Sequence, residues 1–248
     1  MVKVFLDAGH GGVDAGASGN GLFEKDITLH VVKAVEAMLN TMYDGVETKL
    51  SRIDDKFMSL TNRTKAANEW GADFLISVHI NSAENVNAQG FESFSHSTLA
   101  GNATKAFQNV MHSAIMKQCP EFEDRGQRQQ DFHMLRESNM PAVLTESGFI
   151  SSAHDANLLK SSDFIERLVL GHTNGIAQIA GLKRRSSALL SDYKDCYAAK
   201  DIDEIKQLGI MQGYPDGTFK PDRPVSRGDL AIVLNRLIKH MEGRQNDR

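Results

Sequence analysis

Short β-rich runs alternate with longer amphipathic stretches through about the first three quarters of this 248-residue chain. Residues 2–6 (VKVFL) are typical of a buried strand, and residues 25–42 carry apolar side chains at helical spacing. The alternation continues with a helix over 60–70, a strand over 73–80, a helix over 102–118, a strand over 141–147 and a helix over 163–180. We therefore predict an α/β fold with a mixed, largely parallel sheet flanked by helices. In such folds functional residues lie at the carboxyl ends of strands.

A smaller second unit follows a stretch of basic and small polar residues. The predicted domain boundaries are a first domain over 1–182, a linker over 183–190 and a small helical C-terminal module over 191–241. A turn is expected at residues 215–217, where proline, aspartate and glycine follow one another. Residues 242–248 are predicted to form a frayed tail.

Composition excludes several classes of partner. A net charge of −4, with no basic stretch interleaved with aromatic residues, argues against nucleic acid. No apolar stretch is long enough to span a bilayer, so we predict no membrane partner. Cys119 and Cys196 form no C-x-x-C pair and are expected to be plain thiols. The N-terminus lacks the pattern of a signal peptide, so we expect synthesis in the cytoplasm and action after release, or secretion if a signal peptide was trimmed.

A glycine-rich segment, residues 6–26, carries the strongest functional signal. It follows the first predicted strand, holds six glycines around His10 and ends beside Glu24, at the start of the first long helix. His79 and Glu146 each end a later predicted strand, so the four side chains can converge on one edge of the sheet. Two histidines and a carboxylate are a usual ligand set for catalytic zinc. His10, Glu24 and His79 are therefore candidate metal ligands, with Glu146 left as a proton carrier.

Simpler interpretations stay open for each of these residues. A glycine-rich turn after a strand also occurs in phosphate-binding loops, although neither G-x-x-x-x-G-K-[ST] nor G-x-G-x-x-G is present here. Taken alone, His10 or His79 is an ordinary polar residue at a strand end. Glu146 follows the apolar run PAVLT, which predicts that it is partly buried. The following histidines are interpreted as structural: His30, His96, His112, His154 and His172.

Four motifs along the first domain resemble those of a known family. They are LDAGHGGVDAGASG (6–19), FEKDITL (23–29), LSRIDDKFMSLTNRTKAANEWGADFLISVHINS (50–82) and MLRESNMPAVLTESGFISSAHDANLL (134–159). In this order they resemble the zinc-dependent N-acetylmuramoyl-L-alanine amidases, cell-wall hydrolases with a mixed α/β fold. The resemblance covers nearly all of the first domain.

The resemblance implies one Zn²⁺ per chain, held by His10, Glu24 and His79, with Glu146 as the catalytic carboxylate. The implied reaction is hydrolysis of the amide between N-acetylmuramic acid and L-alanine in peptidoglycan. Zinc would acidify a water molecule, and Glu146 would take its proton and later help to protonate the leaving amine. No G-x-S-x-G elbow is present that would suggest a covalent route.

Two further residues fall within these motifs, and His133 lies directly before the last of them. Arg52 and Arg63 match the family pattern, and we expect structural ion pairs from them rather than catalysis. His133 stands where many relatives have an apolar residue. It is either a substrate contact near the cleft or a local variation.

The C-terminal stretch 201–238 resembles one S-layer homology module, a type of module that binds secondary polysaccharide of bacterial walls. Ser226 is the predicted N-cap of its last helix. Arg227 is the candidate polymer contact, because a guanidinium can hold an anionic sugar substituent by paired hydrogen bonds; a solvent-facing helix residue is the alternative. Such modules usually occur in threes, so the single copy predicts either a homotrimer or weak binding. A plain helical cap on the enzyme is the remaining interpretation.

Together these features predict a peptidoglycan amidase that lyses bacterial walls, in the manner of a phage endolysin. A zinc peptidase acting on the stem peptide is the nearest alternative, because metal, water and carboxylate serve any amide. A non-catalytic wall-binding protein is the other, although it would be expected to have lost at least one of the four site residues.

Overall fold

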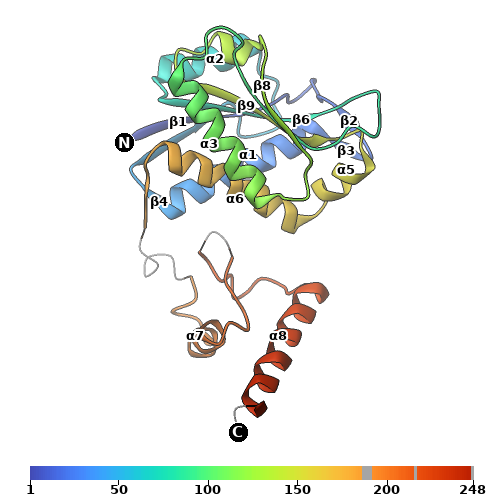
Figure 1. Ribbon diagram of the computed structural model, residues 1–248. Helices are drawn as coiled ribbons and strands as arrows, with labels where there is room; N and C mark the ends of the chain where they lie inside the picture. Colours follow the sequence, from blue (N-terminus) through green and yellow to red (C-terminus); the bar gives the residue numbers. More distant parts are fainter. Residues whose placement is uncertain (186–191, 215–216, 247–248) are drawn as a thin grey trace. The chain divides into compact units, whose positions relative to one another are not determined.

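The computed structural model describes residues 1–185, 192–214 and 217–246, and the chain divides into two compact units, Met1–Arg184 and Arg185–Arg248. The first unit is built on a six-stranded sheet of order β5-β1-β6-β9-β7-β8 (Figure 1). The strands are β1 (Val2–Ala8), β5 (Val46–Leu50), β6 (Phe74–Asn81), β7 (Phe91–Ser95), β8 (Asp124–Gln129) and β9 (Ala142–Phe149). Strands β5, β1, β6 and β9 are parallel, β7 is antiparallel to β9, and β8 is parallel to β7. The predicted mixed, largely parallel sheet is confirmed.

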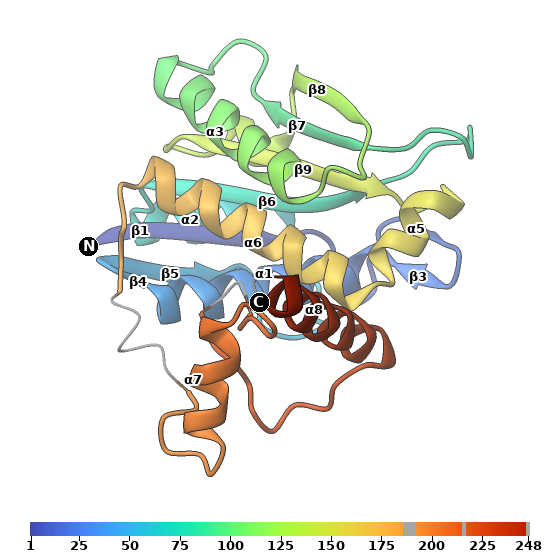
Figure 2. The ribbon, with the colours of Figure 1, turned by 60° about the horizontal axis from the view of Figure 1, so that its bottom comes forward.

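Helices cover both faces of this sheet (Figures 1 and 2). One face carries α1 (Glu24–Met42), α3 (Asn102–Gln118) and α6 (Ser162–Ile179), and the other carries α2 (Leu60–Trp70) and the short α4 (His133–Arg136). The remaining elements of this unit are α5 (Ala153–Leu159) and the two-residue strands β2 (Ser18–Gly19), β3 (Leu22–Phe23), β4 (Tyr43–Asp44) and β10 (Lys183–Arg184). The predicted helices over 25–42, 60–70, 102–118 and 163–180 begin and end within one residue of the observed bounds.

The strands alternate between the two helix layers. Val4, Leu6 and Ala8 of β1 belong to the core under α1, α3 and α6, whereas Phe5 packs in the core under α2 and α4. Burial of both faces explains why residues 4–6 (VFL) are apolar without interruption. Cys119 is buried in the larger core as a free thiol, as predicted.

Strands β7 and β8 were not predicted from the sequence. Strand β7 is fully buried, and it carries a glutamate and two serines among its aromatic residues, so no simple alternation marks it. Strand β8, with the sequence DRGQRQ, lies at the sheet edge and has no apolar side chain at all. Both strands extend the sheet beyond β9.

Two observed elements fall within the predicted linker and tail. Lys183 and Arg184 of the predicted linker pair with β4, and its residues 186–190 lie outside the described part of the chain. The helix α8 (Arg227–Asn246) includes residues 242–246 of the predicted tail, while 247 and 248 are not described.

The second unit has its own small core. Tyr193, Ile202 of α7 (Ala199–Gln207) and Phe219 pack together, and the turn expected at 215–217 falls mostly on residues outside the described ranges. The predicted cap is confirmed, because Ser226 Oγ accepts a hydrogen bond from the Asp229 amide at 3.0 Å. Across the described residues of both units, no helix combines the length and the apolar character needed to cross a membrane.

His172 of α6 is a fully buried histidine whose hydrogen bonds define a neutral ring. Its Nδ1–H donates to the Leu168 carbonyl at 2.9 Å, and Nε2 lies 3.1 Å from the Thr145 hydroxyl, which can donate to it. Burial disfavours the charged imidazole and lowers the pKa of His172 to about 4, with the Leu168 carbonyl opposing the shift. The prediction that this histidine is structural is confirmed.

This histidine should make the first unit less stable in mild acid. Below about pH 6.5 His172 is protonated in the unfolded chain, but in the folded chain it stays neutral down to about pH 4. The free energy of unfolding therefore falls as the pH falls from about 6.5 to about 4. Between pH 7 and pH 5 the loss from this residue is about 2 kcal/mol. Urea denaturation followed by fluorescence of Trp70, the only tryptophan, measures it. His172→Gln should have a lower stability at pH 7 but a smaller loss on acidification, and an unchanged loss would contradict the prediction.

Candidate active site

Three predicted site residues meet at the carboxyl edge of the sheet. His10 follows β1, Glu24 is the first residue of α1, and His79 lies near the end of β6. One potential ligand atom from each lies within 4.8 Å of the others. His79 Nδ1 is 2.9 Å from Glu24 Oε1, and His10 Nε2 is 3.2 Å from Glu24 Oε2. Two imidazoles and one carboxylate therefore face a common centre, a donor set that suits a divalent metal.

Backbone contacts fix the two oxygens of Glu24. The Ile80 amide donates to Oε1 at 3.0 Å, and the Ala17 amide donates to Oε2 at 2.8 Å. Asp14 holds the far side of the His10 ring, because its carboxylate accepts a hydrogen bond from Nδ1 at 2.9 Å and leaves Nε2 directed at Glu24. Carboxylate–histidine pairs of this kind orient imidazole ligands in metal sites.

The glycine-rich loop is required by close approaches of its backbone to these side chains. Gly16 has φ +64°, and a Cβ built there would lie 2.6 Å from both Glu24 Oε2 and the His10 ring. A Cβ on Gly9 would overlap the His79 ring. His10 itself adopts a positive φ of 62°, which few non-glycine residues do. The glycines thus allow the chain to wrap closely around the cluster.

Two buried arginines hold this loop in place. Arg63 of α2 forms an ion pair with Asp7 at 2.7 Å and donates to the carbonyls of Ala8 and His10. Arg52 donates to the carbonyls of Ala8 and Gly9 at 3.1 and 3.0 Å. The expected structural ion pair is confirmed for Arg63. For Arg52 it is not, since the partners found for its guanidinium among the described residues are carbonyl and hydroxyl oxygens.

The charges of the cluster reinforce one another. Burial disfavours a charged His10, but the hydrogen bonds and negative charges of Glu24 and Asp14 outweigh it and raise the pKa of His10 to about 9. Burial likewise disfavours a charged His79, but its hydrogen bond to Glu24 and the negative charges of Glu146, Glu24 and Asp7 together raise its pKa. Conversely, burial would raise the pKa of Glu24, yet the two histidines hold it well below its ordinary range. The pocket therefore attracts positive charge.

Glu146 lies directly beside this cluster. It is opposite His79 in the β6–β9 pairing, so the two side chains project from the same face of the sheet. Its Oε2 is buried and has no hydrogen-bond partner among the described residues. Burial raises the pKa of Glu146 to about 7, while the positive charge of His79 opposes the shift. The predicted partial burial is confirmed.

The same row of side chains continues across two more strands. Glu92 of β7 is opposite Glu146, and a register shift in the β7–β8 pairing sets Arg125 beside Glu92. Arg125 Nε lies 2.5 Å from Glu92 Oε1. Sequence reasoning missed both residues, although a glutamate in the run FESF is the same signal, an acid among apolar residues, that marked Glu146.

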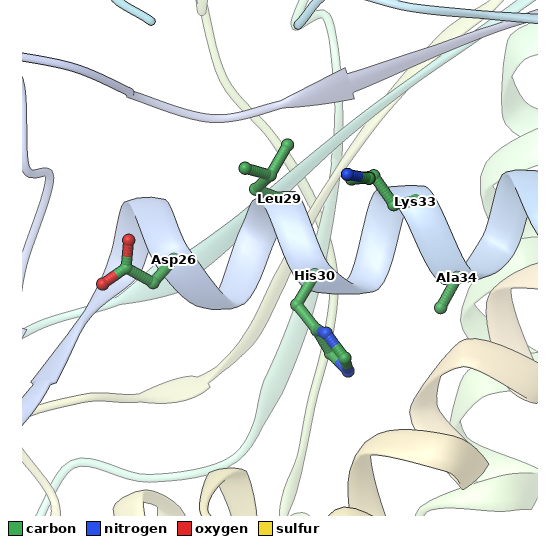
Figure 3. Close-up of a pocket in the computed structure, with 5 residues that line it drawn as sticks. All are labelled: Asp26, Leu29, His30, Lys33 and Ala34. Atoms are coloured by element: carbon green, nitrogen blue, oxygen red, sulfur yellow. The ribbon is translucent and has the colours of Figure 1, made fainter. Parts of the chain in front are cut away.

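The metal-ligand cluster comprises His10, Glu24 and His79, so it does not include His133, which begins α4 and whose Nε2 is 3.4 Å from Thr64 of α2. In the second unit, Arg227 is the exposed first residue of α8. Figure 3 shows His30 on α1 beside a pocket lined by Asp26, Leu29, Lys33 and Ala34, none of which belongs to the cluster. His30 is exposed, in keeping with its interpretation as a residue without a ligand role.

One histidine lies in an arrangement that resembles a nucleophilic triad. His112 is 2.9 Å from Ser93 Oγ through Nδ1 and 2.9 Å from Asp124 Oδ1 through Nε2. Ser93 is completely buried, so no substrate reaches its hydroxyl. The group ties α3 to β7 and β8, and the structural interpretation of His112 is confirmed.

Comparison with known proteins agrees with this fold and identifies the family. Residues 4–178 match the N-acetylmuramoyl-L-alanine amidase family (Amidase_3), and residues 190–231 match the S-layer homology domain. The sporulation-specific N-acetylmuramoyl-L-alanine amidase of Bacillus subtilis (strain 168) is 49% identical over 188 residues, which is 76% of this chain and 72% of that protein. The endolysin of Bacillus phage SPP1 is 40% identical over 217 residues, or 86% of this chain and 78% of that one.

A solved structure also matches the fold of the first unit. The catalytic domain of CwlV, an N-acetylmuramoyl-L-alanine amidase from Bacillus (Paenibacillus) polymyxa var. colistinus, superposes with a TM-score of 0.70 at 36% identity, covering 74% of this chain and all of that domain. The fold is thus that of the N-acetylmuramoyl-L-alanine amidases. The chain belongs to the N-acetylmuramoyl-L-alanine amidase family and carries an S-layer homology domain at its C-terminal end.

The close packing at Gly16 predicts a large effect from a small substitution. Gly16→Ala should lower the rate of wall hydrolysis by about 100-fold or more, because its Cβ displaces Glu24 or His10 by a few tenths of an ångström to an ångström. Gly21→Ala is the matched control, since Gly21 also has a positive φ, of 77°, but no atom within 4 Å of an added Cβ. Gly21→Ala should cost about 1–2 kcal/mol of stability and keep most activity. The loss of turbidity of purified walls measures the activity of the two variants. Equal activities of Gly16→Ala and Gly21→Ala would contradict the steric explanation.

Proposed function

We propose that this chain hydrolyses the amide between N-acetylmuramic acid and L-alanine with one Zn²⁺ held by His10, Glu24 and His79. The observation that carries the proposal is that the loop after β1, the first residue of α1 and the strand β6 bring one ligand atom of each residue within 4.8 Å of the others. The chain's membership of the amidase family supports the same bond as the substrate.

The residues present fit such a metal. Two nitrogen donors and one carboxylate oxygen are the ligands of many catalytic zinc sites with a position left for water. Asp14 supplies the outer carboxylate that orients the His10 ring, and the absence of a side chain at Gly16 leaves room beside Glu24. When bound there, Zn²⁺ lowers the pKa of a water molecule and polarises the scissile carbonyl.

Glu146 is the proposed proton carrier. Its unpartnered Oε2 lies on the same face as His79, so it can accept the proton of the attacking water and pass it to the leaving amine of L-alanine. The backbone amides of Ile80 and Ala17 keep Glu24 fixed during this step, and Asp14 keeps His10 in one ring orientation. Glu146 thus moves the proton while its neighbours stay in place.

Metal content and activity should separate the two proposed roles. His79→Ala is expected to lose both bound zinc and activity, because it removes one of three ligands. Glu146→Gln should keep the zinc and lose about 10²- to 10⁴-fold in rate, the usual contribution of a positioned acid or base. Zinc is measured by elemental analysis of the purified protein, and the product by mass analysis of digested wall.

His30→Ala is the matched control for the first variant, since it removes an exposed histidine of α1 and should change neither quantity. One zinc per chain in His79→Ala would exclude that ligand, and near-normal turnover in Glu146→Gln would exclude the proton transfer. Products with a free muramic acid lactyl group identify the amidase, whereas cuts within the stem peptide would indicate a peptidase.

We further propose that the second unit addresses the enzyme to a secondary wall polysaccharide, with Arg227 as one contact and a homotrimer as the working form. Arg227 is exposed at the start of α8, where the Ser226 cap fixes the backbone. Six apolar side chains of this helix are between 37% and 57% exposed, namely Leu230, Ile232, Leu234, Leu237, Ile238 and Met241. Self-association would cover them, and three linked modules would raise avidity without any new contact.

Truncation tests the address and the assembly together. A chain ending at Arg184 keeps the proposed metal ligands and Glu146 but loses Arg227, so it should hydrolyse soluble glycan peptides at an unchanged rate, bind whole walls weakly and scatter light as a monomer. Arg227→Ala should weaken wall binding in the full chain, and Arg236→Ala, another exposed arginine of α8, serves as its control. Full wall binding by the truncated chain would exclude the module as the address. A monomeric mass for the full-length protein in light scattering would exclude the trimer.

We propose a phage-type lytic role for the whole chain. The similarity to the SPP1 endolysin, which extends over 217 residues, supports this role. The similarity to a sporulation-specific amidase supports a bacterial role instead. A gene located beside one for a membrane pore protein would favour lysis, and expression confined to sporulation would contradict it.

A further inference from the structure

A cationic group lies at the far end of the row that contains Glu146. His79, Glu146, Glu92 and Arg125 follow one another across β6, β9, β7 and β8 on one face of the sheet. Strand β7 runs opposite to β9, so its first residues lie at the same edge as the last residues of β6 and β9. The row therefore leads from the metal-ligand cluster to an arginine at the edge strand.

Arg125 is held in one orientation by its neighbours. Its Nε pairs with Glu92 at 2.5 Å, its Nη1 lies 3.5 Å from the Gln89 carbonyl, and its guanidinium lies 4.8 Å from the centre of the Phe149 ring. Asn81 Nδ2 donates to the other Glu92 oxygen at 3.3 Å. Glu92 is almost completely buried, whereas the Arg125 side chain keeps 26% of its surface exposed. The guanidinium is thus fixed but accessible.

The group has a surplus of positive charge. Arg128 Nη2 lies 3.4 Å from the same Glu92 oxygen, so two guanidinium groups share one carboxylate. Among the described residues, Nη2 of Arg125 donates no hydrogen bond. A fixed guanidinium with a free edge suits a carboxylate, because paired N–H donors match its two oxygens.

The chemistry of the substrate indicates which of its carboxylates the Arg125 guanidinium binds. The carboxyl group of muramic acid is itself part of the scissile amide, so the sugar side offers no carboxylate. Where the residue after L-alanine is joined to the next residue through its side-chain carboxyl, its α-carboxylate is free and is the first carboxylate beyond the scissile bond. Strand β8 lies two strand spacings, about 10 Å, from β9. Two extended peptide residues cover about 7 Å, and the arginine side chain spans the remainder.

With Glu146 in its proposed role, we infer that Arg125, positioned by Glu92, is a specificity-determining residue that binds the α-carboxylate of the stem-peptide residue after L-alanine. The inference rests on the proposed function, and it assigns the β8 side of the edge to the peptide. Amidation of that carboxylate removes the charge and one acceptor, so an amidated stem is the poorer substrate.

Paired substrates test this specificity. Disaccharide peptides that carry either a carboxylate or an amide on the residue after L-alanine are cleaved by the full-length enzyme, and kcat and KM are measured for each. The wild type should prefer the carboxylate by about 10- to 100-fold in kcat/KM, the range for a charge-assisted hydrogen-bonded pair. Arg125→Gln should abolish this preference through KM on the carboxylate substrate, while the amidated substrate changes less than about threefold.

Arg167→Gln is the matched control. Arg167 of α6 has the same 26% exposure, pairs with Glu121 at 2.6 Å and lies 5.2 Å from the Phe164 ring. Replacing it therefore removes an arginine with similar structural contacts but leaves the row from His79 to Arg125 intact. This variant should keep the preference. If Arg125→Gln does not fold, Arg125→Lys decides, because lysine keeps the charge without the paired donors and should lower the preference.

Two outcomes would overturn the inference: a wild type that cleaves both substrates equally well, or folded Arg125 variants that lose the same factor on both. Neither outcome touches the proposed amidase function, which fails only if no lactyl–alanine amide is cleaved in either substrate.

Discussion

The buried ion pair between Asp7 and Arg63 holds the active-site edge together. Both side chains are almost fully enclosed, and Arg63 is among the largest completely buried side chains in the described chain. Ser77 of β6 donates to the second Asp7 oxygen at 2.7 Å, so one carboxylate joins β1, β6 and α2. Burial alone would raise the pKa of Asp7, but Arg63 and Ser77 lower it, which keeps the pair charged. Losing one partner of such a pair costs about 3–5 kcal/mol because the other charge is left unpaired.

The position of His10 depends on this pair. The other guanidinium nitrogens of Arg63 reach the carbonyls of Met58 and His10, so the same side chain that neutralises Asp7 also sets the path of the glycine-rich loop. A loop rich in glycine has high conformational entropy when unfolded, and its ordering must be stabilised by neighbouring contacts. Arg52, Arg63 and the Glu24 carboxylate supply those contacts from three different elements.

The sequence was sufficient to predict the parts of the fold that follow simple periodicity. Residues 25–42 and 2–6 have the helical and buried-strand patterns that their positions require. His10 follows a strand, Glu24 begins a helix and His79 lies near the end of another strand, so all three stand at predictable element boundaries. Glu92 and Arg125 escaped prediction because β7 and β8 lack a periodic pattern: one is buried at every position and the other is a polar edge strand. Their proximity to Glu146 follows from strand order and register, which pair residues 33 to 54 positions apart in the sequence and leave no local signal.

The strand order has a consequence for how the chain acquires its activity. Strand β9 is the last of the six in sequence yet lies between β6 and β7, so the sheet stays in two halves until residues 142–149 have been synthesised. Long-range pairings of this kind are late events in folding. Glu146 lies on that closing strand, between His79 on one half and Glu92 on the other. In a nascent chain on the ribosome, Glu146 therefore cannot take its place beside His79 until the strand that closes the sheet has been synthesised.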